Sequence, residues 1–161
     1  MPQPESLRAS DVAVVARFLQ IRTLIHDHPL ARVERHIVQS FAVETTRRLS
    51  PTLVSHVRTG FVRPGEGELW PVVFMTTVDI SLALCVELPP ERVADLGTTI
   101  NGPQRIRHRS WDTWWGWERP LGQIQPDFFD LDPPAQEDAI VGWFGEGLEW
   151  LAGAGLLLRK A

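Results

Sequence analysis

The amino-acid sequence predicts an α+β fold, a two-layer sandwich in which a mostly antiparallel sheet is packed by an N-terminal helix pair and a C-terminal helix. Two observations lead to this prediction. Near both ends of the chain, apolar residues recur at spacings of three and four, which is the period of an amphipathic helix. Between them lie short runs rich in Val, Ile, Phe and Thr, which are typical of strands.

Length and composition indicate how many domains to expect. The chain has 161 residues, the size of one ordinary domain, and 43% of them are hydrophobic, enough for one core. We therefore predict a single α+β domain over residues 1–161, with residues 1–9 as a flexible start. No apolar run approaches the roughly 20 residues that cross a bilayer, and the N-terminus does not resemble a signal peptide. We expect a cytoplasmic protein with no membrane partner.

The chain from about Ser10 to Leu49 predicts two consecutive helices. His28 precedes Pro29, and because the residue before a proline avoids the helical conformation, the first helix should end there. The second helix should then run on towards Leu49. The predicted buried stripe of the first helix is Val14, Phe18, Ile21 and Ile25, and that of the second is Leu30, Val33, Ile37 and Phe41.

The middle of the chain predicts the sheet. We expect strands over residues 53–62, 69–77 and 80–88, with the last two as antiparallel neighbours. Pro90 suits the first turn of a short helix. A tryptophan-rich strand over residues 105–117 should follow, and then a loop rich in Pro, Asp and Phe.

The C-terminal helix is predicted over residues 133–152. Asp132 is a good N-cap, and Pro133 is well suited to the first helical position. Trp143 and Trp150 flank the apolar stripe on one side. The glycines of this segment lower its helix propensity, which close packing against the sheet would explain. The stripe itself is Ile140, Phe144, Leu148 and Leu151.

Missing residue types exclude several classes of enzyme. The one cysteine, Cys85, lies in an apolar run, which predicts a buried inert thiol and excludes an internal disulfide. The one lysine, Lys160, lies beside the C-terminus, so no lysine is placed for a P-loop, a kinase site or a Schiff base. Catalytic sequence motifs are also absent, so we expect a non-catalytic protein with no cofactor. Many arginines with almost no lysine are also typical of a GC-rich, bacterial-type genome.

The most distinctive segment is an Arg/Trp stripe at residues 105–117. Residues two apart in a strand share a face, so three guanidiniums would precede a row of indoles. Such a row can form a protein-binding surface, because Trp and Arg dominate interface hot spots, or it can hold phosphates and stack nucleobases. One alternative is that residues 110–112 interrupt the strand, and another is that several of these tryptophans pack in the core. The candidate binding residues are Arg105, Arg107, Arg109, Trp111, Trp115 and Trp117.

A histidine group at the junction of the two N-terminal helices is a weaker candidate. His26, His28 and His36 can be brought together by a helical hairpin, and imidazoles bind metal or act as general bases. Their spacing matches no established metal-binding pattern. The alternative is that they are polar surface residues at a helix junction.

These observations lead to three functional hypotheses. The first is a non-catalytic macromolecule-binding module, with a protein partner or a second copy of the chain as a homo-oligomer. The second is a nucleic-acid-binding module that uses the Arg/Trp stripe, although a net charge of −4 is not that of a dedicated nucleic-acid binder. The third is a small hydrolase that uses the three histidines, with or without a metal.

Overall fold

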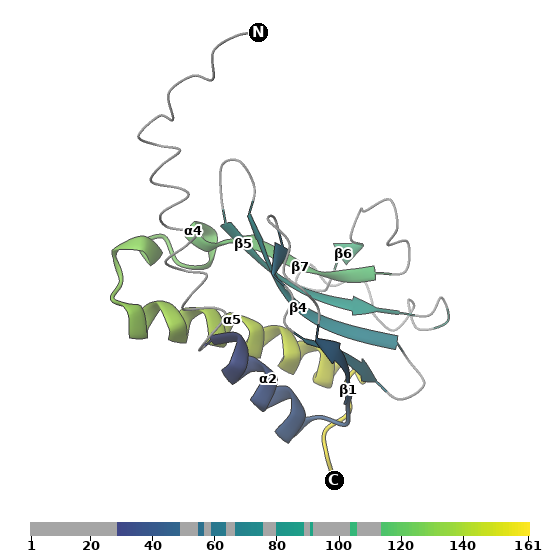
Figure 1. Cartoon of the computed structure of the whole chain (residues 1–161). Coiled ribbons are helices and arrows are strands. Elements are labelled where there is room, and N and C mark those ends of the chain that lie inside the picture. The colour runs from purple at the N-terminus through teal and green to yellow at the C-terminus, as the bar shows by residue number, and fades with distance from the viewer. Residues whose placement is uncertain are drawn as a thin grey trace, which may run out of the picture.

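The computed structural model contains an antiparallel sheet with helices (Figure 1). It describes residues 29–48, 55–56, 59–63, 67–75, 80–88, 91, 104–105 and 114–161. Within these residues the sheet has seven strands in the order β1-β3-β4-β5-β7-β6, with β2 also paired to β4. All of the strand pairs are antiparallel. The predicted α+β class is confirmed.

The bounds of the elements are as follows. The strands are β1 (Glu44–Arg48), β2 (Ser55–His56), β3 (Thr59–Arg63), β4 (Gly67–Met75), β5 (Ile80–Glu87), β6 (Gln104–Arg105) and β7 (Trp114–Pro120). The helices are α2 (Pro29–Ser40), α4 (Leu121–Ile124), the 3₁₀ helix η2 (Phe128–Asp130) and α5 (Pro133–Gly153). The helix predicted before Pro29 lies outside the described residues, as does nearly all of the one predicted from Pro90.

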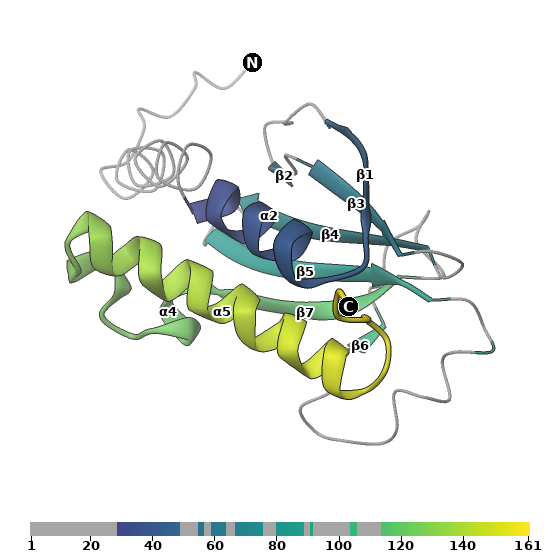
Figure 2. The ribbon, with the colours of Figure 1, turned by 90° about the horizontal axis from the view of Figure 1, so that it is seen from below.

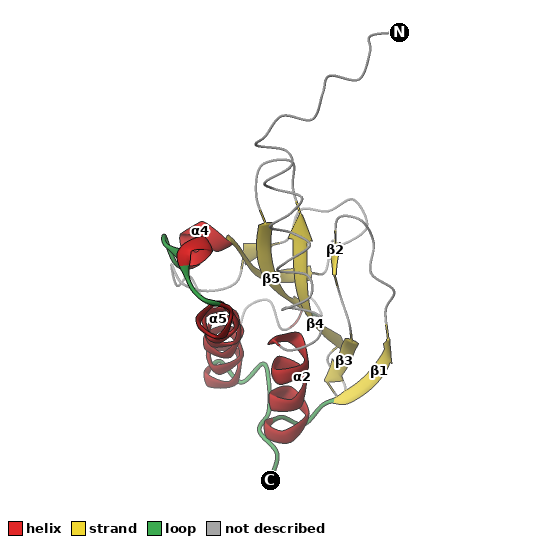
Figure 3. Cartoon of the chain, turned by 60° about the vertical axis from the view of Figure 1, so that its left-hand side comes forward, coloured by secondary structure: helices red, strands yellow, loops and turns green. Residues whose placement is uncertain are grey.

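Helices α2 and α5 lie side by side on one face of the sheet (Figures 2 and 3). The core lies between these helices and the strands, and β5 shows how it is built. Its Leu82, Leu84 and Val86 belong to the buried cluster beneath the helices, whereas the alternate residues Ala83 and Cys85 are buried outside that cluster. This alternation is the period of a strand.

Helix α2 begins at the predicted break and buries the predicted stripe. Leu30, Val33 and Ile37 are all buried, and Phe41 is buried just beyond the helix end. The prediction that the helix runs on towards Leu49 is wrong, because α2 ends at Ser40 and β1 follows. β-branched residues at positions 43, 45 and 46 favour a strand there, and pairing with β3 outweighs the helical pattern.

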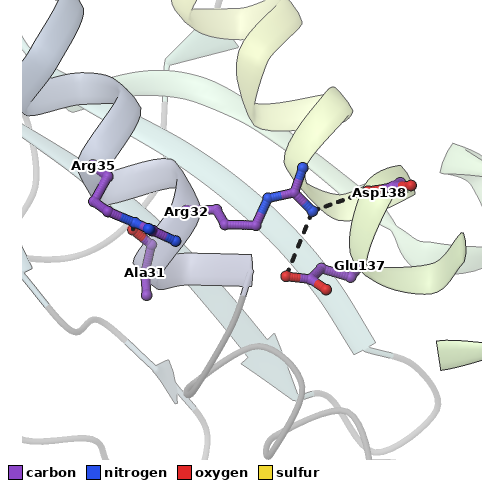
Figure 4. Close-up of polar contacts among 5 residues, drawn as sticks. All are labelled: Ala31, Arg32, Arg35, Glu137 and Asp138. Carbon is purple, nitrogen blue, oxygen red and sulfur yellow. Dashed lines mark hydrogen bonds and ion pairs between the residues drawn. The ribbon is translucent and has the colours of Figure 1, made fainter. Parts of the chain in front are cut away.

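One ion-pair group connects the two long helices. Arg32 of α2 places its Nη1 atom 2.9 Å from Asp138 Oδ1 and 3.5 Å from Glu137 Oε1, both on α5 (Figure 4). The Arg32 side chain keeps 40% of its surface exposed. Exposed ion pairs stabilise little, so burial of the apolar stripes holds the helices together.

The predicted central strands are present. β4 and β5 pair antiparallel as expected. The segment predicted as a strand over 53–62 forms β2 and β3, which follow one another along the same edge of β4. Ser55 lies opposite Phe74 and Phe61 lies opposite Leu69, so the register shifts by one residue between the two strands.

The prediction of one strand over 105–117 is wrong. β6 and β7 are separate antiparallel strands, with Arg105 directly opposite Trp115. The chain must therefore reverse its direction between residues 105 and 114. Alternate positions of residues 105–117 therefore do not belong to one strand, as the predicted stripe requires.

Helix α5 agrees with its prediction in bounds, cap and buried face. Asp132 caps it by accepting a hydrogen bond from the backbone N–H of Ala135, at 3.1 Å. In the segment predicted as a loop, α4 and η2 form short helices, and Phe128 is fully buried. No helix in the described part of the chain combines the length and apolarity of a membrane span. The residues predicted for the buried stripe, Ile140, Phe144, Leu148 and Leu151, are all buried.

Candidate binding cleft

A cleft of about 320 Å³ lies between α5 and the strands β5 and β7. Three of its lining residues are tryptophans, and two others carry side chains of opposite charge. The lining residues are Leu84, Trp117 and Arg119 from the strands and Trp143, Glu146, Gly147 and Trp150 from α5. We call it the tryptophan cleft.

Simple periodicities bring the three indoles together. Trp143, Gly147 and Trp150 follow one another at spacings of four and three along α5, so they share one face of the helix beside the buried stripe. On β7, Trp117 and Arg119 are two residues apart and share the face of the sheet that α5 covers. The cleft forms where these two faces meet.

Gly147 lets α5 approach the sheet closely at this point. A Cβ atom on residue 147 would lie 2.7 Å from Cδ2 of Leu84 and 3.5 Å from Cε3 of Trp117. A Cβ atom on Gly142 or Gly145 would have no neighbour within 4 Å. Close packing against the sheet therefore explains Gly147 but not Gly142 or Gly145, and Gly147 is part of the cleft wall.

Packing fixes the positions of the tryptophan rings. The rings of Trp117 and Trp150 meet edge to face, with centroids 5.4 Å apart and an interplanar angle of 74°. Trp143 packs edge to face on Phe144 at 5.1 Å. All three tryptophans are half-buried, so each keeps part of its surface available for a ligand. An aromatic surface that is already ordered loses little conformational entropy on binding.

The two charged residues of the cleft are both exposed. Arg119 donates a hydrogen bond from Nη1 to the backbone carbonyl of Glu118 at 2.8 Å. Glu146 extends from α5, a helix with four acidic residues and no basic one. Arginines on other elements form ion pairs with the remaining three acids, Glu137, Asp138 and Glu149. Among the described residues, Glu146 makes no ion pair.

No family model, no curated protein and no solved structure matches this chain. What the chain binds is therefore inferred from its own residues.

The Arg/Trp stripe predicted from the sequence is only partly described. Trp115 and Trp117 lie half-buried in β7 and pack against the core, and Trp117 also lines the cleft. Arg105 lies on the neighbouring strand, opposite Trp115. The other three predicted residues, Arg107, Arg109 and Trp111, lie outside the described residues.

The sequence did not indicate that Trp143 and Trp150 belong with Trp117. Their spacing of seven already placed them together beside the buried stripe of α5. What was missing is that α5 packs next to β7, a contact between residues about 30 positions apart that no local pattern reports. Arg119 and Glu146 are single charged residues, so the sequence alone did not identify them as part of a site.

Only one of the three candidate histidines is described. His36, in α2, shares a hydrogen bond of 3.2 Å between its Nδ1 and the Ser40 hydroxyl, and its ring meets Phe41 edge to face. His26 and His28 lie outside the described residues. In the part of the chain that the structure does describe, no three His, Cys, Asp or Glu residues lie together as a metal site would require.

The predicted inert thiol is confirmed. Cys85 is fully buried in β5, on the side of the sheet away from the main cluster. Burial raises the pKa of its thiol to about 12, and the negative charge of Glu118 adds to this effect. Because the thiolate is the nucleophile, Cys85 is unreactive near neutral pH.

Proposed function

We propose that the protein is a non-catalytic macromolecule-binding module with a protein partner, and that a segment of the partner binds in the tryptophan cleft. The observation that carries this proposal is the convergence of three half-buried indoles, Trp117, Trp143 and Trp150, beside Arg119. Tryptophan and arginine are the residues most enriched in interface hot spots, and those hot spots lie in well-packed pockets.

The chemistry of the cleft supports binding more than catalysis. Its lining residues in the described part of the chain include no Ser, Cys, His or Lys, the usual nucleophiles and bases. The one carboxylate, Glu146, is exposed and has no second carboxylate or imidazole beside it in the lining. Three tryptophans beside two separate charged groups are typical of recognition.

The wider proposal keeps the architecture predicted from the sequence and, from the Arg/Trp stripe, the residues of β6 and β7. The scaffold is a two-layer sandwich completed by the N-terminal helix pair. The proposed surface extends from the cleft to Trp115 and towards the edge strand β6, where Arg105 is the register partner of Trp115. A second copy of the chain is one form that the protein partner can take.

A nucleic-acid-binding module is the second candidate. The observation that favours it is the same pair, Arg105 and Trp115, since an arginine and a tryptophan are opposite each other in the register of β6 and β7. It predicts binding that weakens steeply as salt is added, because phosphate contacts release counterions. The net charge of −4 favours the protein partner.

The test is a selection of binding peptides against the whole chain. A random library of nine-residue peptides is selected on the purified protein, and the selected peptides are synthesised with a fluorescein label. Their dissociation constants are then measured by fluorescence anisotropy. We expect Trp143→Ala and Trp150→Ala each to weaken binding by about tenfold or more, as hot-spot residues do.

The control is Leu158→Ala, which removes an apolar side chain that is 68% exposed and not part of the cleft lining. It should leave the affinity unchanged, and circular dichroism should show that all three variants are folded. The proposal is wrong if no peptide binds, or if the tryptophan variants bind as well as the control. Binding of labelled oligo(dT) that falls steeply with salt supports the second candidate instead.

A further inference from the structure

We infer that the partner segment bound in the tryptophan cleft is cationic, a peptide that presents an arginine or lysine side chain to the indoles. This inference rests on the proposed function, since it names the chemistry of the ligand for the same cleft. It is drawn from the aromatic walls, the position of Glu146 and the charges carried by α5.

The aromatic walls suit a cation. The face of an indole carries negative electrostatic potential, and tryptophan is the best aromatic partner for an ammonium or guanidinium group. Trp117, Trp143 and Trp150 line the cleft together and are half-buried. A cation that enters the cleft can contact more than one of these rings, because Trp117 and Trp150 already meet edge to face.

Glu146 is placed to pair with such a cation. It lies three residues after Trp143 and four residues before Trp150, so all three occupy neighbouring positions on the surface of α5. Glu146 therefore neighbours both tryptophans on the helix and is one of the residues that line the cleft. Because Glu146 makes no ion pair among the described residues, it is open to one from a ligand.

The charge of α5 also favours a cationic ligand. The helix carries four carboxylates and no basic residue, including in its last turn. Arg32 offsets Glu137 and Asp138 near the start of α5, and Arg159 offsets Glu149. The cleft lies along the second half of the helix, towards the end where the helix dipole is negative and cations are favoured.

Arg119 carries the positive charge of the cleft, opposite in sign to Glu146. Its guanidinium would repel a cationic ligand and attract an anionic one, while Glu146 would do the reverse. A cationic partner therefore predicts that neutralising Glu146 weakens binding and that neutralising Arg119 strengthens it. An anionic partner, a nucleic acid included, predicts the opposite sign for both variants.

The experiment uses the nine-residue peptides selected on the whole chain and their fluorescein-labelled synthetic forms. We expect the selected sequences to be enriched in Arg and Lys. Replacing the arginines of a selected peptide by citrulline, a neutral residue of nearly the same shape, should weaken its binding by about tenfold, the scale of a desolvated cation–π contact.

Three charge variants of the protein complete the test. We expect Glu146→Gln to weaken binding of the arginine peptide by about fivefold and Arg119→Gln to strengthen it by about threefold, as rim charges do. Glu149→Gln is the matched control, because it removes the same charge from the same helix outside the cleft lining. It should change the affinity by less than about twofold.

The outcomes separate this inference from the proposed function. Selected peptides that contain no basic residue, or reversed signs for Glu146→Gln and Arg119→Gln, overturn the cationic partner and leave the cleft as a binding site. Peptides whose citrulline forms bind equally well also overturn it. If no peptide binds at all, the proposed function and this inference fail together.

Discussion

Gly147 determines how closely α5 packs on the sheet. A Cβ atom there would lie 2.7 Å from Cδ2 of the buried Leu84 side chain, which would have to shift, whereas a Cβ atom on Gly142 would have no neighbour within 4 Å. Gly142→Ala should therefore raise the free energy of unfolding by about 0.5–1 kcal/mol, the gain in helix propensity. Gly147→Ala should leave the free energy of unfolding unchanged or lower it, because crowding against Leu84 offsets the gain in helix propensity.

Urea denaturation of the two variants measures this difference directly. Both substitutions make the same chemical change in the same helix, so the comparison isolates the contact with Leu84. If Gly147→Ala were stabilised as much as Gly142→Ala, the cleft floor would be less tightly packed than the structure indicates.

The Cys85 thiol makes stability fall in alkaline solution. Its pKa is about 12 in the folded protein, so above about pH 9 the unfolded chain loses a proton that the folded chain keeps. The free energy of unfolding should therefore decrease by about 1.4 kcal/mol for each pH unit between about pH 9 and 12. The chain has no tyrosine and one lysine, so few other side chains titrate in this range.

Cys85→Ala is the control for this pH dependence. Without the thiol, the free energy of unfolding should stay nearly flat from pH 9 to about pH 11. If urea denaturation showed that the free energy of unfolding falls equally steeply in wild type and variant, the thiol would not be responsible. Lys160 is exposed and remains in both proteins, so it cancels in the comparison.

At the scale of secondary-structure elements, the contact between α2 and α5 is held by apolar burial rather than by charge. Arg32→Ala breaks the exposed ion pairs with α5 and should lower the free energy of unfolding by less than about 1 kcal/mol. Ile37→Ala leaves a cavity at a fully buried position and should lower the free energy of unfolding by about 2–5 kcal/mol. Thermal or urea unfolding ranks the two variants, and a larger loss for Arg32→Ala would contradict this account.

Sequence periodicity predicted the elements with a clear buried stripe. Helix α5 has its predicted cap at Asp132 and its predicted buried face, and the stripe of α2 is also as predicted. Local patterns failed where pairing between strands decided the outcome. The segment at β1 was assigned to a helix, and the segment over 105–117 was assigned to one strand. In both cases pairing with another strand, β3 for β1 and β7 for β6, fixes the conformation.

At the scale of the whole molecule, the cleft exists only because α5 lies beside β7. Trp117 was predicted as a binding residue from the Arg/Trp stripe, whereas Trp143 and Trp150 were noted only as flanking an apolar stripe. Their meeting depends on how a helix packs on a sheet, which follows from the burial of both apolar faces at once. The sequence therefore predicts the tryptophans of the site individually but not their assembly.

Nuclear magnetic resonance of the tryptophan indole N–H groups tests most directly whether the cleft is the binding site. The chain has seven tryptophans, and Trp70 provides an internal reference, because it lies opposite Cys85 in the sheet and does not line the cleft. On titration with a selected arginine peptide, we predict that the resonances of Trp117, Trp143 and Trp150 shift while that of Trp70 stays in place. Shifts confined to Trp70, or no shift of the three cleft resonances under saturating peptide, would contradict the account.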